Sequence, residues 1–191
     1  MIVFKGTNQD MTCTKGNGTF RYNLGETIKE EQSKTARKGL HCTENPFLVL
    51  DWYGLGRGNR YFLCEAAGSI DEDKEDNKIA CTELTVKKEL TVKELAGYGM
   101  MYMVSHPLRS WKKSGHMLEI AEGKAEASCA GAIAIARGEN PKVRGAAGSY
   151  LGLIRENAGL IEEAKLFTVE GDIKPDTWYT LEGRQPKEVQ A

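Results

Sequence analysis

The sequence lacks the features that would tie it to a membrane, to nucleic acid or to an oxidising compartment. Its apolar runs fall well short of the roughly 20 residues that a transmembrane helix needs. Lys and Arg (26) are balanced by Asp and Glu (27), so there is no basic excess of the kind that binds a phosphate backbone. The opening MIVFKGTNQD has neither the basic start nor the apolar stretch of a secretory signal. We therefore expect a cytoplasmic protein that binds neither membranes nor nucleic acids.

The sequence also lacks motifs for metals, cofactors and nucleophilic catalysis. Its five cysteines are scattered and form no C-x-x-C pair, which argues against a zinc site and against a disulfide framework (Cys13, Cys42, Cys64, Cys81 and Cys129). The segment GLGRG matches neither a P-loop nor a dinucleotide-binding fingerprint. We expect buried thiols in a reducing compartment, no metal and no cofactor.

Alternating and apolar segments in the first half predict strands. MIVFKG is a short apolar segment that stops at Gly6, and NRYFLCEAAGSI and IACTELTVKKEL are longer candidates. GTFRYNLG and ETIKEEQ are weaker ones. The charged run DEDKEDNK between the two long segments predicts a solvated loop.

Two segments of the first half predict short helices. Asn45 is a capping residue type and Pro46 suits a first helical position, so a helix is expected from about Pro46 to Tyr53. Thr91 is expected to cap a second helix in TVKELAGYGMMYMVS, where apolar residues recur at helical spacing. Residues 1–106 are therefore predicted to form an α+β domain with a mixed or antiparallel sheet.

Evenly spaced glycines dominate the chain after a stretch of linker composition at residues 107–114. They are separated by seven or eight residues: Gly115, Gly123, Gly131, Gly138, Gly145 and Gly152. A continuous helix would lose about 1 kcal/mol at each glycine relative to alanine. Residues 132–136 instead alternate alanine with isoleucine, the period of a strand. Residues 115–191 are predicted to form a β-roll or solenoid that ends in a β-meander, with turns at Asn157–Gly159 and Gly171–Asp172.

The segments AIAIARGEN and VRGAAGSYLGL resemble the head repeats of trimeric autotransporter adhesins. Those repeats have the pattern A-x-A-x-G-x-N-S-x-A-x-G and form β-rolls that assemble as trimers. This chain departs from the pattern with Pro141 at the usual serine and with Ala136 and Arg137 inserted before Gly138. The resemblance implies a roll and a homo-oligomer, most simply a trimer.

Nearly the whole chain resembles an uncharacterised family that phages and prophages encode. The shared features here are Phe4-Lys5-Gly6 with Cys13, Gly39-Leu40-His41, Arg60-Tyr61-Phe62 and the tail GDIKPDTWY. The resemblance implies a mobile-element origin and a location in the cytoplasm of a bacterial host. It implies no activity.

The layout of the first half also resembles ADP-ribosyltransferase folds. In that family a Gly-[Ile/Leu]-Tyr segment stacks nicotinamide and a later strand supplies a catalytic glutamate, so the resemblance implies roles for His41 and Glu83. The family's His-Gly-[Ser/Thr] triplet and Glu-x-Glu pair are missing here.

Aromatic and basic residues gather in the segment DWYGLGRGNRYF. Aromatic rings stack on purines and arginines bind phosphates in a bidentate manner, so this segment is a candidate ligand site (Trp52, Tyr53, Arg57, Arg60 and Tyr61). A flexible surface turn explains a Gly-Arg-Gly segment equally well. Lys5 and Arg21 would add charge to such a pocket if their strands were neighbours. Glu65 and Glu83 could form a carboxylate pair.

Three functions fit these observations. The first is a phage-encoded, non-enzymatic protein that sequesters a small nucleotide-derived immune signal, because phages commonly use compact oligomers in this way. The second is an ADP-ribosyltransferase-like or nucleotide-cleaving enzyme that uses His41 and Glu83. The third is a structural, trimerising virion or scaffold protein.

Overall fold

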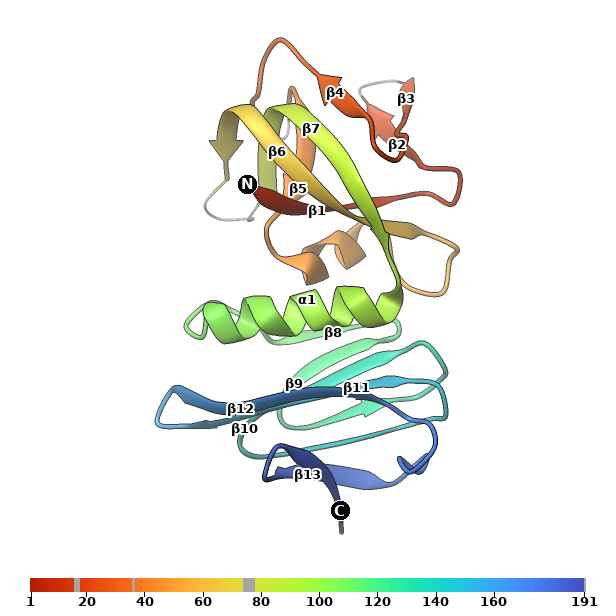
Figure 1. Ribbon diagram of the computed structural model, residues 1–191, viewed down its shortest axis with the longest axis vertical. Coiled ribbons are helices and arrows are strands. Elements are labelled where there is room, and N and C mark those ends of the chain that lie inside the picture. Colours follow the sequence, from red (N-terminus) through yellow and green to blue (C-terminus); the bar gives the residue numbers. More distant parts are fainter. Residues whose placement is uncertain (16–17, 36, 74–77, 191) are drawn as a thin grey trace. The chain divides into compact units, whose positions relative to one another are not determined.

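The computed structural model describes residues 1–15, 18–35, 37–73 and 78–190, and within them the chain is mostly β-structure with two short helices (Figure 1). The chain divides into an N-terminal unit, Met1–Leu95, and a C-terminal unit, Ala96–Ala191. The division falls within helix α1 (Val92–Ser105), upstream of the linker predicted at residues 107–114. No helix among the described residues has the length and apolar character needed to cross a membrane.

The N-terminal unit is built on antiparallel strands. They are β1 (Ile2–Thr7), β4 (Thr27–Lys29), β5 (Leu40–Thr43), β6 (Arg60–Glu72) and β7 (Lys78–Leu90), with a separate hairpin of β2 (Thr12–Lys15) and β3 (Gly18–Arg21). Both β1 and β7 pair with β5 and with β6, so these four strands close into a ring, and β4 extends β7. β6 and β7 form the long hairpin of this unit (Figure 1). The charged loop predicted at DEDKEDNK lies between them, and its residues 74–77 lie outside the described residues.

Both predicted helices form, each with the expected cap. The first is a 3₁₀ helix, η1 (Pro46–Asp51), whose Asn45 side chain accepts a 3.1 Å hydrogen bond from the Phe47 backbone N–H. In α1, the Thr91 hydroxyl accepts from the Glu94 N–H and the Glu94 carboxylate accepts from the Thr91 N–H. This reciprocal pair is a capping box, which satisfies two backbone donors at the helix start.

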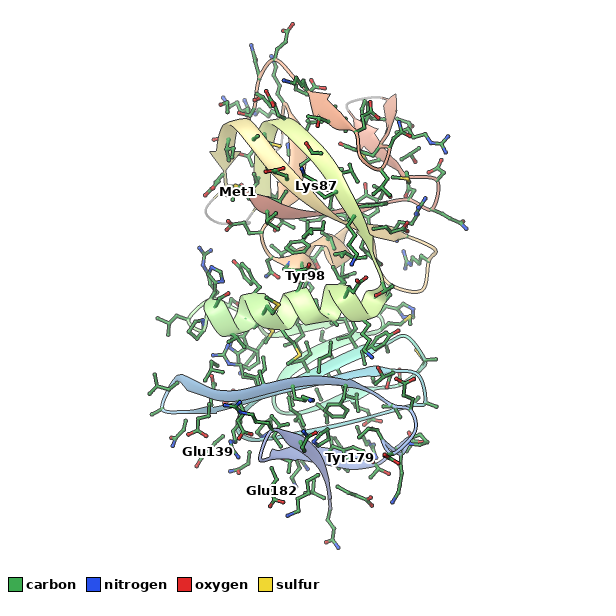
Figure 2. The ribbon with its side chains drawn as sticks, in the orientation of Figure 1. Met1, Lys87, Tyr98, Glu139, Tyr179 and Glu182 are labelled. Carbon is green, nitrogen blue, oxygen red and sulfur yellow. The ribbon has the colours of Figure 1, made fainter. Side chains whose placement is uncertain are left out.

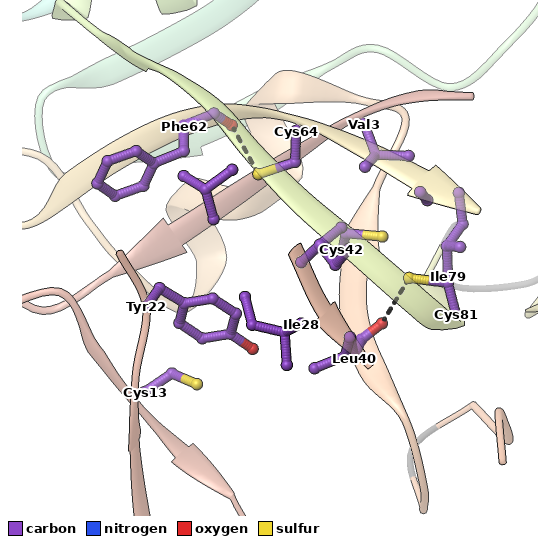
Figure 3. Packing of buried hydrophobic residues seen from close by; sticks show 13 residues of the cluster. Val3, Cys13, Tyr22, Ile28, Leu40, Cys42, Phe62, Cys64, Ile79 and Cys81 are labelled. Atoms are coloured by element: carbon purple, nitrogen blue, oxygen red, sulfur yellow. Dashed lines mark hydrogen bonds between the residues drawn. The ribbon is translucent and has the colours of Figure 1, made fainter. Parts of the chain in front are cut away.

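The core of the N-terminal unit combines apolar side chains with four of the cysteines. Cys13, Cys42, Cys64 and Cys81 are buried and unbridged, and Cys129 of the other unit is exposed. The Cys81 thiol donates to the Leu40 carbonyl at 3.4 Å (Figure 3). These thiols fill the core as small apolar side chains do, as expected from their apolar sequence context.

The C-terminal unit is also built on strands. They are β8 (Lys113–Gly115), β9 (Leu118–Ala127), β10 (Ile133–Gly145), β11 (Tyr150–Asn157), β12 (Leu160–Thr168), β13 (Trp178–Glu182) and β14 (Gln185–Val189). The three consecutive strands β9, β10 and β11 pair in parallel, and the other strand pairs of the unit are antiparallel. Ile133 of β10 is opposite Leu118 of β9 on one side and opposite Tyr150 of β11 on the other. Short turns join these parallel neighbours.

The strand β10 bends in the middle, and glycines mark the bend. Its first part pairs with β9 and β11, and its second part pairs with β9 and β13. Gly138 in β10 and Gly123 in β9 both have positive φ, which glycine adopts without a steric penalty. The region is therefore strand, as the glycine spacing predicts, and not an alanine helix.

The two faces of residues 132–136 are both buried. The alanines belong to a core cluster with Leu151 and Leu153. The isoleucines face the other way, where Ile135 and Met100 of α1 meet at Gly152. Tyr179 packs in the alanine-lined interior, whereas Glu139 and Glu182 lie at the surface (Figure 2).

The predicted turn at Asn157–Gly159 joins β11 to β12. Ala158 and Gly159 have φ of 49° and 80°, and Asn157 pairs with Leu160. Two consecutive positive φ values define the turn that best matches the twist of a two-residue hairpin. Gly171, in the second predicted turn, also has positive φ.

Candidate functional site

A cleft with a volume of about 1380 Å³ lies along β1 and β5 of the N-terminal unit. Phe4 and Thr43 form the one register pair between these strands among the described residues, and both line the cleft. Beyond this pair the strands separate, so side chains rather than backbone hydrogen bonds bridge the space. The remaining walls come from β2, Tyr22, the end of β4 with the segment that follows it, the end of η1 and the start of β7.

Lys5 lies at the floor of this cleft and bridges the two strands. Its side chain is only 7% exposed, although lysine is almost never fully buried. The Nζ atom donates a 2.8 Å hydrogen bond to the His41 carbonyl on β5. It also lies 4.5 Å from the centre of the Tyr22 ring, a cation–π contact.

His41 lines the same floor and is half-buried. Its burial lowers the pKa of the imidazole, and the positive charges of Lys5 and Lys78 lower it further. Both effects favour the neutral form of the imidazole. Its Nε2 atom is buried and has no hydrogen-bond partner among the described residues.

Two aromatic residues at the end of η1 form one side of the cleft. Trp52 is 52% exposed, and the Nζ atom of Lys78 lies 5.3 Å from its ring centre. Tyr53 packs against the backbone of Gly6, where an added Cβ would lie 2.6 Å from the tyrosine Cδ2. A side chain at position 6 would therefore collide with the Tyr53 ring. This collision explains why the apolar segment MIVFKG ends with a glycine.

Further charged residues line the cleft. The described lining contains five cations, Lys5, Lys29, Arg37, Lys38 and Lys78, and three carboxylates, Glu30, Glu31 and Asp51. Lys29 forms a 3.1 Å ion pair with Glu83, and Lys38 donates to the Gln32 side chain at 2.9 Å. The balance is positive, so the cleft favours an anionic ligand.

The structure brings four of the nine predicted ligand residues together at this cleft. Lys5, His41, Trp52 and Tyr53 line it, and the other five do not: Arg21, Arg57, Arg60, Tyr61 and Glu83. Arg21 and Arg57 are exposed elsewhere on the unit. Of the aromatic-basic segment, Trp52 and Tyr53 thus line the cleft, whereas Arg57, Arg60 and Tyr61 lie outside it.

The remaining predicted residues have structural partners. The Arg60 guanidinium binds the Glu89 carboxylate through two hydrogen bonds of 2.7 and 2.6 Å. The Tyr61 hydroxyl donates to the Tyr53 carbonyl at 2.9 Å, and burial raises the pKa of Tyr61 to about 12. Arg60 therefore links the start of β6 to the end of β7, and Tyr61 links β6 to the residues that follow η1.

The proposed carboxylate pair of Glu65 and Glu83 does not form. Glu65 is bound to Lys87 at 2.6 Å and Glu83 to Lys29. In the β6–β7 ladder Glu83 is opposite Ala67. The two carboxylates do not pair because Glu65 is opposite Thr85, two residues away from Glu83, and each binds a lysine on a neighbouring strand.

Four cations that line the cleft were not predicted from the sequence: Lys29, Arg37, Lys38 and Lys78. They come from three separate segments of the chain, and no spacing relates them. Lys78 is opposite Thr43 in the β5–β7 ladder, a neighbour that only the fold supplies.

The lining residues of this cleft are suited to binding an anion, because cations outnumber carboxylates among them. Two thiols, Cys13 and Cys42, line it. The hydrogen bond shared with Cys81, together with burial, raises the pKa of Cys42 well above its ordinary value, so this thiol is a poor nucleophile. The described residues contain no cluster of three or more His, Cys, Asp or Glu side chains that could hold a metal ion.

Comparison with known families identifies the N-terminal part of the chain. Residues 1–97 match the family described as a domain of unknown function, DUF7666. The match covers more than half of the chain, so the protein belongs to this family. It includes all of the N-terminal unit and thus the whole cleft. No curated protein matches the chain, and neither does a solved structure.

Proposed function

We propose that the N-terminal unit is a binding module for a small anionic molecule of the nucleotide class, which it holds without converting it. The observation that carries this proposal is the lining of the cleft, which combines five cations with an exposed indole ring. Nucleotides need both kinds of contact: an aromatic surface for the base and fixed cations for the phosphates.

The arrangement of the lining residues supports a defined pose. A base stacks on the exposed face of Trp52, and Lys78 beside that ring contacts the attached phosphate or ribose. The volume of about 1380 Å³ is larger than most small-molecule pockets and accommodates a nucleotide or a dinucleotide.

Sequestration is the biological role that we propose for this binding. The resemblance to phage-encoded proteins suggests a cytoplasmic protein of an infected bacterium whose target is a nucleotide-derived immune signal. A protein that only sequesters a signalling molecule needs affinity for it and no catalytic groups. The cations and the indole ring that line the cleft are consistent with such a role.

Isothermal titration with AMP and with a cyclic dinucleotide tests the proposal. We expect at least one to bind, and we expect Trp52→Ala to weaken that binding by about 1–3 kcal/mol, the usual contribution of one stacked base. Arg57→Ala is the matched control, because Arg57 is exposed and does not line the cleft. Absence of binding by any nucleotide, or equal affinity of the Trp52 variant, would exclude the proposal.

The alternative of an ADP-ribosyltransferase-like enzyme needs His41 and Glu83 at one cavity. His41 lines the cleft, but Glu83 does not line it and is bound to Lys29. No specific contact therefore favours this alternative.

We also propose that the C-terminal unit is a β-roll through which the chain assembles, most simply as a trimer. Parallel pairing of β9 with β10 and of β10 with β11, together with glycines at the bends, supports the roll. The alanines that resemble adhesin repeats are buried within the unit, so subunit contacts must use its other surfaces. Light scattering of the purified protein reports the subunit number, with three times 21.1 kDa expected. A trimer that binds no nucleotide would favour the structural alternative of a virion or scaffold protein.

A further inference from the structure

Lys5 is a buried cation without a carboxylate partner. No carboxylate lies within ion-pair distance of its Nζ atom among the described residues, and its contacts are the His41 carbonyl and the Tyr22 ring. Moving an ammonium group from water into a protein interior costs several kcal/mol, which a carbonyl and a ring face offset only in part. An anionic ligand would balance this charge.

The neighbours of Lys5 add no negative charge. The thiols of Cys42, Cys64 and Cys81 lie close enough to respond electrostatically to Lys5, and their core is otherwise apolar. Tyr22 stays a neutral phenol, because burial and then the neighbouring Cys13 thiol raise its pKa above the ordinary value. The floor of the cleft therefore carries uncompensated positive charge.

His41 lines the same cleft as Lys5. Its imidazole is close enough for the Lys5 charge to lower its pKa, and its buried Nε2 atom has no partner among the described residues. The Phe4–Thr43 pair, which joins β1 to β5 next to Lys5, also lines the cleft. One cleft therefore offers an anion both a buried cation and an unpaired imidazole nitrogen.

We propose that Lys5 binds the terminal phosphate of the ligand within the cleft, with His41 as the second contact and the base stacked at Trp52. The ligand class is then a nucleotide with a phosphomonoester end, in preference to a cyclic nucleotide. A phosphomonoester carries close to two negative charges at pH 7, which the buried ammonium balances better than it would the single charge of a diester. This inference rests on the proposed function and specifies the orientation of the ligand.

The first test compares AMP with cyclic AMP on the wild-type protein by isothermal titration. We expect AMP to bind more tightly by about tenfold or more, since only AMP has a terminal phosphate for a charge-assisted hydrogen bond. Equal affinities would overturn the inference and leave the proposed function intact. If neither nucleotide binds, the inference fails, and titration with the cyclic dinucleotide then decides whether the proposed function fails as well.

The second test is Lys5→Met, which removes the charge and keeps an unbranched side chain. We expect AMP affinity to fall by about tenfold to a hundredfold, while the urea midpoint of the ligand-free protein stays equal or rises because the buried charge is gone. Lys29→Met is the control, as its side chain is 69% exposed, and we expect a smaller loss of affinity. If Lys5→Met lowers the urea midpoint and binds AMP like the wild type, Lys5 is structural and the inference is wrong. If the variant does not fold, the comparison of AMP with cyclic AMP decides.

Discussion

Arg137 is the second deeply buried cation among the described residues, and its environment is the opposite of that of Lys5. Its side chain is 3% exposed and forms a 2.6 Å ion pair with Glu156. It also donates to the Pro107 carbonyl at 2.9 Å and lies 5.0 Å from the Trp111 ring centre. Arg137 thus ties the segment predicted as a linker to the strands of the C-terminal unit.

We expect Glu156→Ala to destabilise the protein by about 3 kcal/mol, because it leaves the Arg137 charge buried and unpaired. The free energy of unfolding in urea measures this. Glu162→Ala is the control: its pair with Arg155 is exposed, so its loss costs less than about 1 kcal/mol. Equal losses in the two variants would show that the burial of Arg137 has no energetic consequence.

At the level of the element, the regularly spaced glycines of the C-terminal unit have different physical roles. Gly123, Gly131 and Gly138 have positive φ and allow bends or turns. Gly152 lies inside β11, where an added Cβ would be 2.7 Å from the Met100 sulfur and 2.8 Å from the Ile135 Cγ1. Its function is to let α1 approach the strand.

Gly152→Ala is therefore expected to cost about 1–3 kcal/mol through overpacking. Gly115→Ala, at a position with no atom within 4 Å of the added Cβ and no positive φ, should change stability little. Thermal unfolding of both variants compares them directly. A neutral Gly152→Ala would mean that α1 moves away from β11 without cost.

At the level of the whole molecule, the cysteines report on the two units separately. The four buried thiols belong to the N-terminal unit and the exposed Cys129 to the C-terminal unit. A thiol reagent should label one of the five cysteines of the native protein rapidly. The other four should react at the rate at which the N-terminal unit opens, and a bound nucleotide should slow them by stabilising the closed state.

Mass spectrometry after timed labelling measures this difference. Rapid labelling of all five thiols would show that the N-terminal core is open to solvent. Slow labelling that nucleotide leaves unchanged would argue against binding in that unit.

Local sequence signals predicted the secondary structure well. Asn45 with Pro46 and Thr91 with Glu94 mark helix starts, because a cap is a contact between residues that are near in sequence. Ala158-Gly159 marks a hairpin for the same reason. The alternation at residues 132–136 indicated strand over helix, since period two is a property of the strand itself. The trimer, the ligand and the phage origin stay predictions.

The site was only partly predictable. Four of the nine candidate residues line the cleft. Trp52 and Tyr53 came from the aromatic-basic segment, Lys5 from the condition that its strand is a neighbour, and His41 from the resemblance to ADP-ribosyltransferase folds. Glu83 was chosen for its position on a strand, but the β6–β7 register places it opposite Ala67 and the β4–β7 pairing binds it to Lys29. Register depends on which strands become neighbours, and a single sequence does not contain that information.

The sequence by itself determined the absence of an apolar span, the positions of caps and turns, and the strand character of the glycine-rich half. These depend on interactions over a few residues. Only the tertiary structure decided that β1 and β5 separate after one residue pair, that Lys5 is buried between them without a carboxylate, and that Arg137 has one. The desolvation of a charge is fixed by every segment that packs around it, so it emerges only when the whole chain is folded.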